Sequence, residues 1–147
     1  MEKKKVMIVE DSTTMRLIIR NMINTNLHLT VVKTAANGRE ALELLPSAQP
    51  DLILLDLEMP EMGGMEFLRH ARLKTRAKIV VLSSIAVAGS PVVAQARALG
   101  ADAVMSKPSG AVSFDLADKR GAEFWELIHR LLGIDMAEPV PAKGDQG

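Results

Sequence analysis

Residues 51–56 read Asp-Leu-Ile-Leu-Leu-Asp, and this stretch decides the fold. Four consecutive apolar residues between two acids are typical of a strand that is buried on both faces of a parallel sheet. The closing acid, Asp56, then lies at the carboxyl end of the strand. Open α/β sheets place their binding and catalytic groups at that edge, so we expect Asp56 to belong to a functional site.

Apolar runs and amphipathic stretches alternate along the rest of the chain. Helices are expected where apolar side chains recur at three- and four-residue spacing. Pro46 is expected to end the helix that opens at Asn37, and Ser90-Pro91 is expected to start the helix over 92–99. Further strands are expected at 5–9, 29–33, 79–82 and 103–106. Five strand-helix units predict a doubly wound α/β fold with a five-stranded parallel sheet and five helices.

The composition excludes several classes of protein. The chain has 147 residues, of which 48% are hydrophobic and 24% are charged, as in a single soluble globular domain. Lys and Arg balance Asp and Glu at 18 each, so no basic surface for nucleic acid is indicated. Cysteine is absent, which excludes disulfides and zinc-thiolate sites. No apolar segment is long enough to span a membrane, and we expect a cytoplasmic protein.

The apolar periodicity stops near Met136. We expect one domain over residues 1–134, followed by a linker or disordered tail over 135–147 that is rich in proline and polar residues. The three histidines, His28, His70 and His129, share no ligand spacing, and we interpret them as surface residues.

Two acids, Glu10 and Asp11, follow the first strand and should share a sheet edge with Asp56. Three carboxylates in one place repel one another unless a cation lies between them or one of them holds a proton. A hard divalent ion with oxygen ligands relieves that repulsion, and Mg²⁺ fits best. The alternative is that Glu10 and Asp11 only favour the amino end of the following helix.

Ser83 and Lys107 end two further strands and complete the candidate site. A carboxylate such as Asp56 can attack phosphorus to form an acyl phosphate, provided that cations offset the charge of the phosphoryl group. Lys107 would be the fixed cation, and Ser83 would donate a hydroxyl hydrogen bond. Pro108 allows a cis peptide bond that would hold the next turn in a defined shape. Singly, each residue also has an ordinary interpretation as a turn or surface residue.

Together these motifs resemble the receiver domain of two-component response regulators. The resemblance covers roughly residues 4 to 133. It implies a flavodoxin-like sheet with strand order 2-1-3-4-5. The residues that carry it are Glu10-Asp11, Asp56 with the segment 57–64 after it, Ser83 after the apolar run 79–82, and Lys107-Pro108.

The resemblance implies a role for each site residue. Asp56 is the expected phosphoacceptor. Ser83 is the expected switch hydroxyl, with Ser84 as the less favoured candidate, and Lys107 is expected to bind the phosphoryl group. Glu58 and Ile85 are expected to tune the lifetime of the phosphorylated state. The expected Mg²⁺ ligands are the carboxylates of Glu10, Asp11 and Asp56 and the backbone carbonyl of Glu58.

Partners follow from the same resemblance. A histidine kinase is the expected phosphodonor. An output protein or domain is expected on the face of the fourth helix, the fifth strand and the last helix, without nucleic acid or membrane as a partner. Val104 occupies the position where receivers commonly carry an aromatic switch residue, so coupling to that face is expected to use smaller aliphatic movements.

A narrower resemblance concerns residues 82–90 and 107–116, which are similar to the receiver half of chemotaxis-type protein-glutamate methylesterases. It implies a signalling switch in a chemotaxis-like system. Those methylesterases carry a separate esterase domain after a linker, but the sequence from Ala137 onward is a short polar tail. We therefore expect no methylesterase domain in this chain and no enzymatic activity beyond self-phosphorylation and autodephosphorylation. Three alternatives remain: a receiver-like scaffold that acts without phosphorylation, an aspartate-based phosphohydrolase, and a flavodoxin-like cofactor carrier.

Overall fold

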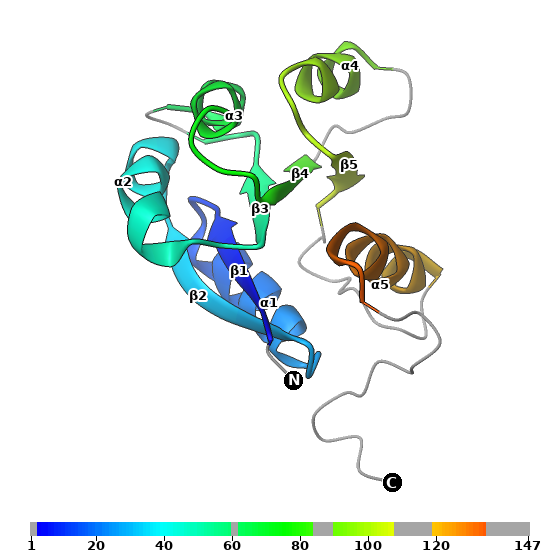
Figure 1. Cartoon of the computed structure of the whole chain (residues 1–147). Helices are drawn as coiled ribbons and strands as arrows, with labels where there is room; N and C mark the ends of the chain where they lie inside the picture. Colours follow the sequence, from blue (N-terminus) through cyan, green and yellow to red (C-terminus); the bar gives the residue numbers. More distant parts are fainter. Residues whose placement is uncertain (1–2, 60–61, 84–89, 108–118, 135–147) are drawn as a thin grey trace, which may run out of the picture.

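The computed structural model describes residues 3–59, 62–83, 90–107 and 119–134. Strands and helices alternate from the first described residues to the last (Figure 1). Their bounds are β1 Lys4–Val9, α1 Thr13–Asn24, β2 Leu29–Ala35, α2 Gly38–Ala48, β3 Leu52–Asp56, α3 Gly64–Ala71, β4 Lys78–Ser83, α4 Pro91–Ala98, β5 Ala103–Ser106 and α5 Lys119–Leu132. Among the described residues, none of these helices has both the length and the apolar composition needed to cross a membrane.

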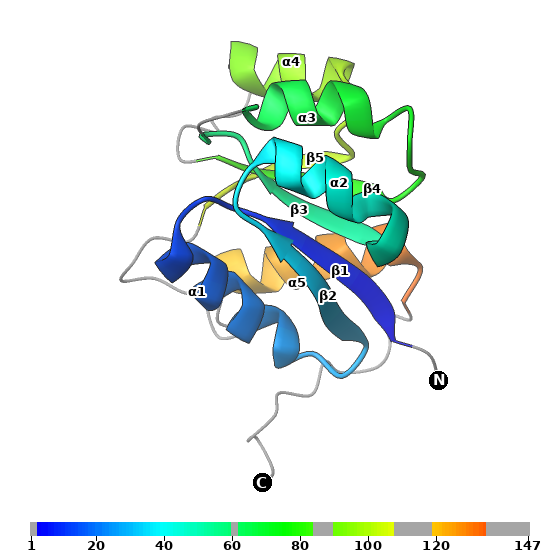
Figure 2. The same cartoon turned by 90° about the vertical axis from the view of Figure 1, so that its left-hand side faces the viewer.

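The strands form one parallel sheet in the order β2-β1-β3-β4-β5, which confirms the expected fold class. Helices α2, α3 and α4 cover one face, and α1 and α5 cover the other (Figures 1 and 2). In β3, Ile53 and Leu55 pack toward the first group of helices, whereas Leu52 and Leu54 pack toward the second. The uninterrupted apolar run of β3 is therefore explained by a strand with two buried faces.

Side-chain caps define the starts of three helices, as the sequence indicates. The hydroxyl of Ser12 accepts from the N–H of Met15 at the start of α1, and Ser90 caps α4 ahead of Pro91. Asn37 caps α2 by accepting from the N–H of Glu40 at 2.8 Å. Each cap satisfies a backbone donor that has no partner within its own helix.

The expectation that Pro46 ends its helix is wrong, because α2 continues to Ala48. Proline in a helix loses its own backbone donor and crowds the carbonyl one turn earlier. Here it stands in the last turn, so little helix remains after it. The helix ends instead at Gln49, which adopts a left-handed conformation with φ 43° and donates its N–H to Leu45 O.

The interpretation of His129 as a surface residue is also wrong. Its side chain is buried on the inner face of α5, and its Nε2 lies 2.9 Å from Nδ2 of Asn26. Burial, with the charge of His28, lowers the pKa of His129 below its usual value. The imidazole therefore belongs to a buried polar contact between α5 and the turn after α1.

Candidate functional site

The parallel topology brings the candidate site residues to one edge of the sheet. Glu10 directly follows β1, Asp56 closes β3, Ser83 closes β4, and Lys107 directly follows β5. The last ladder pair of β4 and β5 is Ser83 with Ser106, and the N–H of Lys107 donates to Ser83 O at 3.2 Å. The carboxyl ends of four strands therefore meet at one place, as the sequence predicts.

The ammonium group of Lys107 lies among the acids at this edge of the sheet. Its Nζ lies 2.9 Å from Oδ1 of Asp56, 3.6 Å from Oε1 of Glu10 and 3.6 Å from Oε1 of Glu58. Asp56 and Glu10 are almost completely buried, with side chains only 1% exposed. Asp56 Oδ1 also accepts the backbone N–H of Glu58 at 3.0 Å. One ammonium group therefore faces three carboxylates, two of them removed from water.

The carboxylates form a cluster suited to a hard cation. One oxygen each from Glu10, Asp11 and Asp56 lies within 4.8 Å of the others. Two oxygens at this edge, Oε1 of Glu10 and Oδ2 of Asp56, are buried without a hydrogen-bond partner in the described structure. Buried carboxylate oxygens without donors are costly unless a cation or a proton satisfies them. The donors are all carboxylate oxygens, and the cluster is open to solvent at Asp11. Such a set fits Mg²⁺.

The same crowding changes the protonation of the acids. Burial is the largest cause that raises the pKa of Glu10, and the neighbouring Asp56 adds to it. The Ser12 N–H and Lys107 oppose these effects, and the resulting pKa is about 8. Burial likewise raises the pKa of Asp56, although the hydrogen bond from Lys107 opposes the shift. For Lys107, burial lowers the pKa, but Asp56, Glu10 and Glu58 outweigh burial and raise it above the usual value.

We expect the free energy of unfolding to fall as pH rises from 6.5 to about 8 in a buffer that chelates divalent ions. Glu10 has a higher pKa when folded than when unfolded, so the folded chain binds more protons, and this contribution to stability is lost as pH rises toward about 8. Below pH 6.5 the lowered pKa of His129 makes stability rise with pH, because the unfolded chain then binds more protons at this residue. This opposite effect sets the lower limit of the pH range. Urea unfolding followed by circular dichroism at several pH values measures the slope.

Glu10→Gln is the matched variant for this experiment, because it keeps the shape of the side chain and removes the titration. Its stability should vary less with pH over the same window. Saturating Mg²⁺ should flatten the wild-type slope as well, since a bound cation replaces the proton. An unchanged slope in Glu10→Gln would show that another group titrates.

Ser83 has a specific partner in this structure. Its side chain is buried, and its Oγ donates to Oε2 of Glu58 at 2.7 Å. The Glu58 side chain is 38% exposed, so the carboxylate reaches from the loop after β3 across the mouth of the site. Glu58 therefore holds both the hydroxyl of Ser83 and, at longer range, the ammonium of Lys107.

Two features that support the site follow the acids in the chain. Arg16 on α1 donates from Nη1 to the backbone carbonyl of Glu10 at 2.7 Å, which fixes the loop that carries the acid pair. Gly64 allows the loop after β3 to close, because a Cβ there would lie 2.6 Å from Asp56 O. The sequence interpretation missed Arg16, although a basic residue in the helix directly after the acid pair is a usable signal.

The remaining predicted site residues are placed only in part. Ser84, Ile85 and Pro108 lie outside the described residues, so their positions and the geometry of the turn after Lys107 are not tested. Asp11 is exposed beside the buried acids. Val104 is partly buried and packs against the core formed with α2, α3 and α4.

Comparisons with known proteins agree with this geometry. Residues 6–116 match the response regulator receiver domain family. A protein-glutamate methylesterase/protein-glutamine glutaminase 1 of Syntrophomonas wolfei is 38% identical over 131 residues, covering 89% of this chain and 36% of the relative. The chain thus spans about a third of the length of the curated methylesterases that it matches first.

Two solved structures are similar over nearly their whole length. A chain in the crystal structure of the P1 domain of CheA3 in complex with CheY6 from R. sphaeroides is 53% identical, with a TM-score of 0.74 over 90% of this chain and 99% of that chain. The response regulator domain of Thermotoga maritima CheB is 29% identical, with a TM-score of 0.79 over 91% of this chain and 99% of that chain. The sequence match, the shared fold and the strand-edge cluster agree, and the chain belongs to the response regulator receiver domain family.

Proposed function

We propose that this chain is a phosphorylation-operated switch of a two-component, chemotaxis-like system, with residues 1–134 as the receiver and 135–147 as a linker or tail. Asp56 is the phosphoacceptor and a histidine kinase is the donor. The observation that carries the proposal is the pairing of Lys107 Nζ with Asp56 Oδ1 at 2.9 Å, next to two buried carboxylate oxygens that have no hydrogen-bond partner in the described structure. A receiver used only as a scaffold would have no need for this costly arrangement.

The residues that would hold Mg²⁺ are the carboxylates of Glu10, Asp11 and Asp56, whose oxygens are within 4.8 Å of one another, together with the backbone carbonyl of Glu58. When bound, Mg²⁺ supplies positive charge that offsets the charge of the transferring phosphoryl group. The N–H of Ser12 donates to Oε2 of Glu10 at 3.0 Å and so orients that carboxylate.

Phosphoryl transfer needs a nucleophile and a fixed cation from this chain. A carboxylate oxygen of Asp56 attacks the phosphorus of the phosphohistidine. An O–P bond forms while the P–N bond breaks, and the imidazole nitrogen of the donor keeps the electron pair and takes a proton from solvent. Lys107 lies close enough to Asp56 to stabilise the added negative charge. Later attack of water on phosphorus restores the Asp56 carboxylate and releases inorganic phosphate.

The switch lies in the exchange of hydrogen-bond partners. The hydroxyl of Ser83 donates to Glu58 in this structure, and it would leave Glu58 to donate to a phosphoryl oxygen. Lys107 directly follows β5, so its new contact would pull on that strand. We infer that the output surface is the face of α4, β5 and α5, with Ser84 as a second hydroxyl candidate and Ile85 beside Glu58 as a tuner of lifetime.

The native context is inferred from the relatives. The similar structure from R. sphaeroides contains a P1 domain of CheA3 in complex with CheY6, which supports a kinase domain of that kind as the donor. The similarity to methylesterases supports a chemotaxis role in the cytoplasm. The residues of this chain supply self-phosphorylation and autodephosphorylation, not ester hydrolysis.

The proposal is tested by intact-mass analysis after incubation with acetyl phosphate or phosphoramidate and Mg²⁺. We expect one added phosphoryl group, which depends on the metal and is lost at alkaline pH as acyl phosphates are. No added mass with either donor, at any Mg²⁺ concentration, would favour the scaffold. Repeated turnover of a phosphomonoester would favour a phosphohydrolase.

We expect Glu58→Gln to take up the phosphoryl group faster than the wild type, by about fivefold. The carboxylate of Glu58 competes for Ser83 and Lys107 and repels the incoming phosphoryl group, whereas a neutral amide accepts more weakly. Removing a charge repulsion of about 1 kcal/mol from a partly exposed site corresponds to that factor. Quenched-flow measurement of uptake from phosphoramidate gives the rate.

Glu66→Gln is the control for Glu58→Gln, since it removes an exposed acid from α3 at a residue outside the site cluster. Its rate should equal the wild-type rate. A Glu58→Gln rate equal to or below the wild-type rate would mean that the contact with Ser83 does not oppose phosphorylation.

A further inference from the structure

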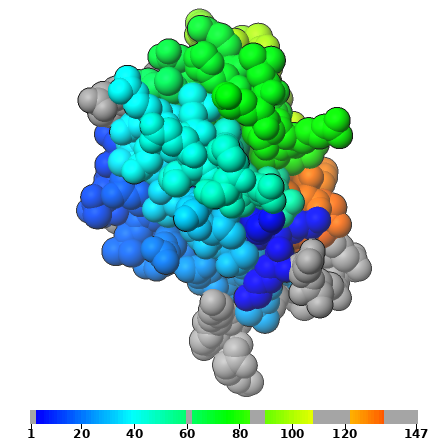
Figure 3. Space-filling view, turned by 60° about the vertical axis from the view of Figure 1, so that its left-hand side comes forward, coloured from blue at the N-terminus to red at the C-terminus, as the bar shows by residue number. Residues whose placement is uncertain are grey.

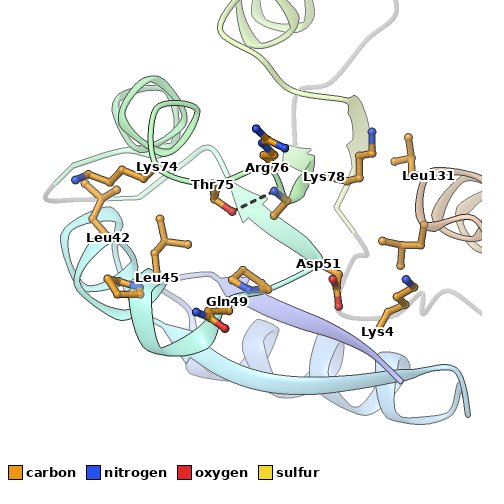
Figure 4. A pocket seen from close by; sticks show the side chains of 14 residues that line it. Lys4, Leu42, Leu45, Gln49, Asp51, Lys74, Thr75, Arg76, Lys78 and Leu131 are labelled. Carbon is orange, nitrogen blue, oxygen red and sulfur yellow. Dashed lines mark hydrogen bonds between the residues drawn. The ribbon is translucent and has the colours of Figure 1, made fainter. Parts of the chain in front are cut away.

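A groove lies at the edge of the sheet opposite the acidic site. It has a volume of about 700 Å³ and is bounded by the start of β1, the end of α2, the segment between α3 and β4, and the end of α5 (Figure 4). We call it the basal groove, and its lining includes Leu42, Leu45, Lys74, Lys78 and Leu132. Figure 3 shows the blue start of β1, the end of α2, the green segment after α3 and the orange end of α5 on one face.

The rim of the basal groove is cationic. Lys4, Lys74, Arg76 and Lys78 line it, and all four are exposed. None of these side chains forms an ion pair or a hydrogen bond with another described residue, in contrast to Arg72, which pairs with Asp102. A smaller hollow beside the groove is lined by Lys3 and Lys5 as well. Six cationic side chains thus gather at one end of a chain whose net charge is zero.

The one acid among the described lining residues, Asp51, does not neutralise this rim. Its Oδ2 accepts the backbone N–H of Lys5 at 2.7 Å. The backbone of Asp51, the residue before β3, also forms hydrogen bonds with Lys5 in β1 and with Lys78 in β4. The carboxylate of Asp51 therefore helps to hold the start of β1 in place next to β3. The excess positive charge of the rim is left for a ligand.

The groove also has an apolar lining. Leu42, Leu45, Pro50, Leu131 and Leu132 contribute to it, and they come from α2, α5 and the residue before Asp51. In Figure 4, Leu42 and Leu45 lie at one end of the groove, Leu131 lies at the other, and Lys74 and Arg76 line the upper side. Leucine side chains at the ends of a groove with a cationic rim match an extended segment with a large apolar side chain flanked by acids.

Other ligand classes fit the basal groove less well. A flat anionic membrane does not reach the floor of a concave site, and no aromatic residue lines the groove to stack on a nucleotide base. A small inorganic anion would find exposed lysines rather than converging buried donors. A peptide uses both the charge and the apolar surface.

We propose that the basal groove is a docking site for an acidic peptide segment of a partner protein, anchored by one large apolar side chain against the leucine side chains at one end of the groove. The strands separate this groove from the phosphorylation site by about 17 Å. A partner could therefore remain bound here whether or not Asp56 carries a phosphoryl group, and the proposal does not depend on the phosphorylation chemistry.

Fluorescence anisotropy tests the proposal with a labelled probe peptide, Glu-Asp-Leu-Glu-Asp, acetylated at its amino end and amidated at its carboxyl end. We expect saturable binding to the full chain that weakens as sodium chloride is added. Replacing the acids of the probe by their amides, or its leucine by serine, should each abolish saturation. The double variant Lys74→Glu/Arg76→Glu should weaken binding by about tenfold or more.

The matched control is Arg20→Glu/Lys33→Glu, which makes the same change in net charge at exposed residues outside the groove. Its affinity should stay within about twofold of the wild type. Phosphoryl uptake at Asp56 should be normal in both double variants, so failure of this proposal and failure of the switch are distinguishable.

Three outcomes would overturn the proposal. Equal weakening in both double variants would mean general charge attraction. Binding to anionic vesicles through Lys74 and Arg76, without saturable binding of the peptide, would mean a lipid surface. Binding of the probe only after removal of residues 135–147 would mean that the chain's own carboxyl-terminal segment is the occupant.

Discussion

Asp56→Asn is expected to lose phosphoryl uptake completely, with no added mass from acetyl phosphate or phosphoramidate in the presence of Mg²⁺. The amide keeps one oxygen that can accept from Lys107 and from the Glu58 N–H, as Oδ1 of Asp56 does now. It lacks the anionic oxygen needed to form an acyl phosphate. Intact-mass analysis under conditions that saturate the wild type gives the result directly.

Loss of uptake in Asp56→Asn should not reflect misfolding. The amide nitrogen can take the place of Oδ2 of Asp56, which has no hydrogen-bond partner in the wild type, and can donate to the neighbouring carboxyl group of Glu10. Because the pKa of Glu10 is about 8, the two carboxyl groups repel each other only above that pH. In that range the metal-free variant should be more stable than the wild type by on the order of 1 kcal/mol. Urea unfolding measures the change.

The control for Asp56→Asn is Glu43→Gln, which removes an exposed acid from α2. It should accept one phosphoryl group as the wild type does. If Asp56→Asn still gained one phosphoryl group, peptide mapping would locate it. A modified residue elsewhere at the strand edge would reject Asp56 as the phosphoacceptor.

Much of the architecture could be predicted from the sequence because the three central strands, β1, β3 and β4, are largely buried. A run such as 52–55 has no polar residue that could face solvent, so its burial could be predicted from its composition. Its place in the strand order 2-1-3-4-5 was implied by the resemblance to receiver domains. The edge strand is less well defined: β2 continues to Ala35, two residues past the predicted end at Lys33, because its pairing with β1 extends to Val9. Pairing of that kind depends on the neighbouring strand.

The failures have a common physical cause. Pro46 was expected to end a helix on propensity, yet the cost of proline depends on how much helix follows it, which only the fold decides. His129 follows Ile128 on α5, and its burial depends on Asn26, more than one hundred residues earlier in the chain. Tertiary contacts of this range leave no local pattern to interpret.

For the candidate site, the sequence predicted which side chains lie close together but not which hydrogen bonds they form. That four strand ends share one edge follows from topology, so the proximity of Asp56 and Lys107 was expected. The contact of Ser83 with Glu58 depends on side-chain rotamers, and the support from Arg16 depends on the angle of α1 to the sheet. These two contacts are what the structure adds to the hypothesis.

Asp11→Asn is expected to weaken Mg²⁺ binding by about 10- to 100-fold, because it removes one charged oxygen donor from a set of three acids. Asp11 is exposed, unlike Glu10 and Asp56, so its replacement should leave packing intact. Titration calorimetry at a pH at least one unit above the Glu10 pKa of about 8, where Glu10 is largely ionised, measures the affinity with little linked proton release.

The informative comparison is between affinity and stability in the same protein. Three acids within 4.8 Å of one another repel, so removing one of them should leave the metal-free free energy of unfolding unchanged or raise it, even as Mg²⁺ affinity falls. Glu43→Gln should change neither quantity.

If Asp11→Asn lowered stability as well as affinity, Asp11 would be a structural residue of the loop after β1. If it changed neither, the cation would lie elsewhere, and the buried oxygens of Glu10 and Asp56 would need a proton rather than a metal to explain them.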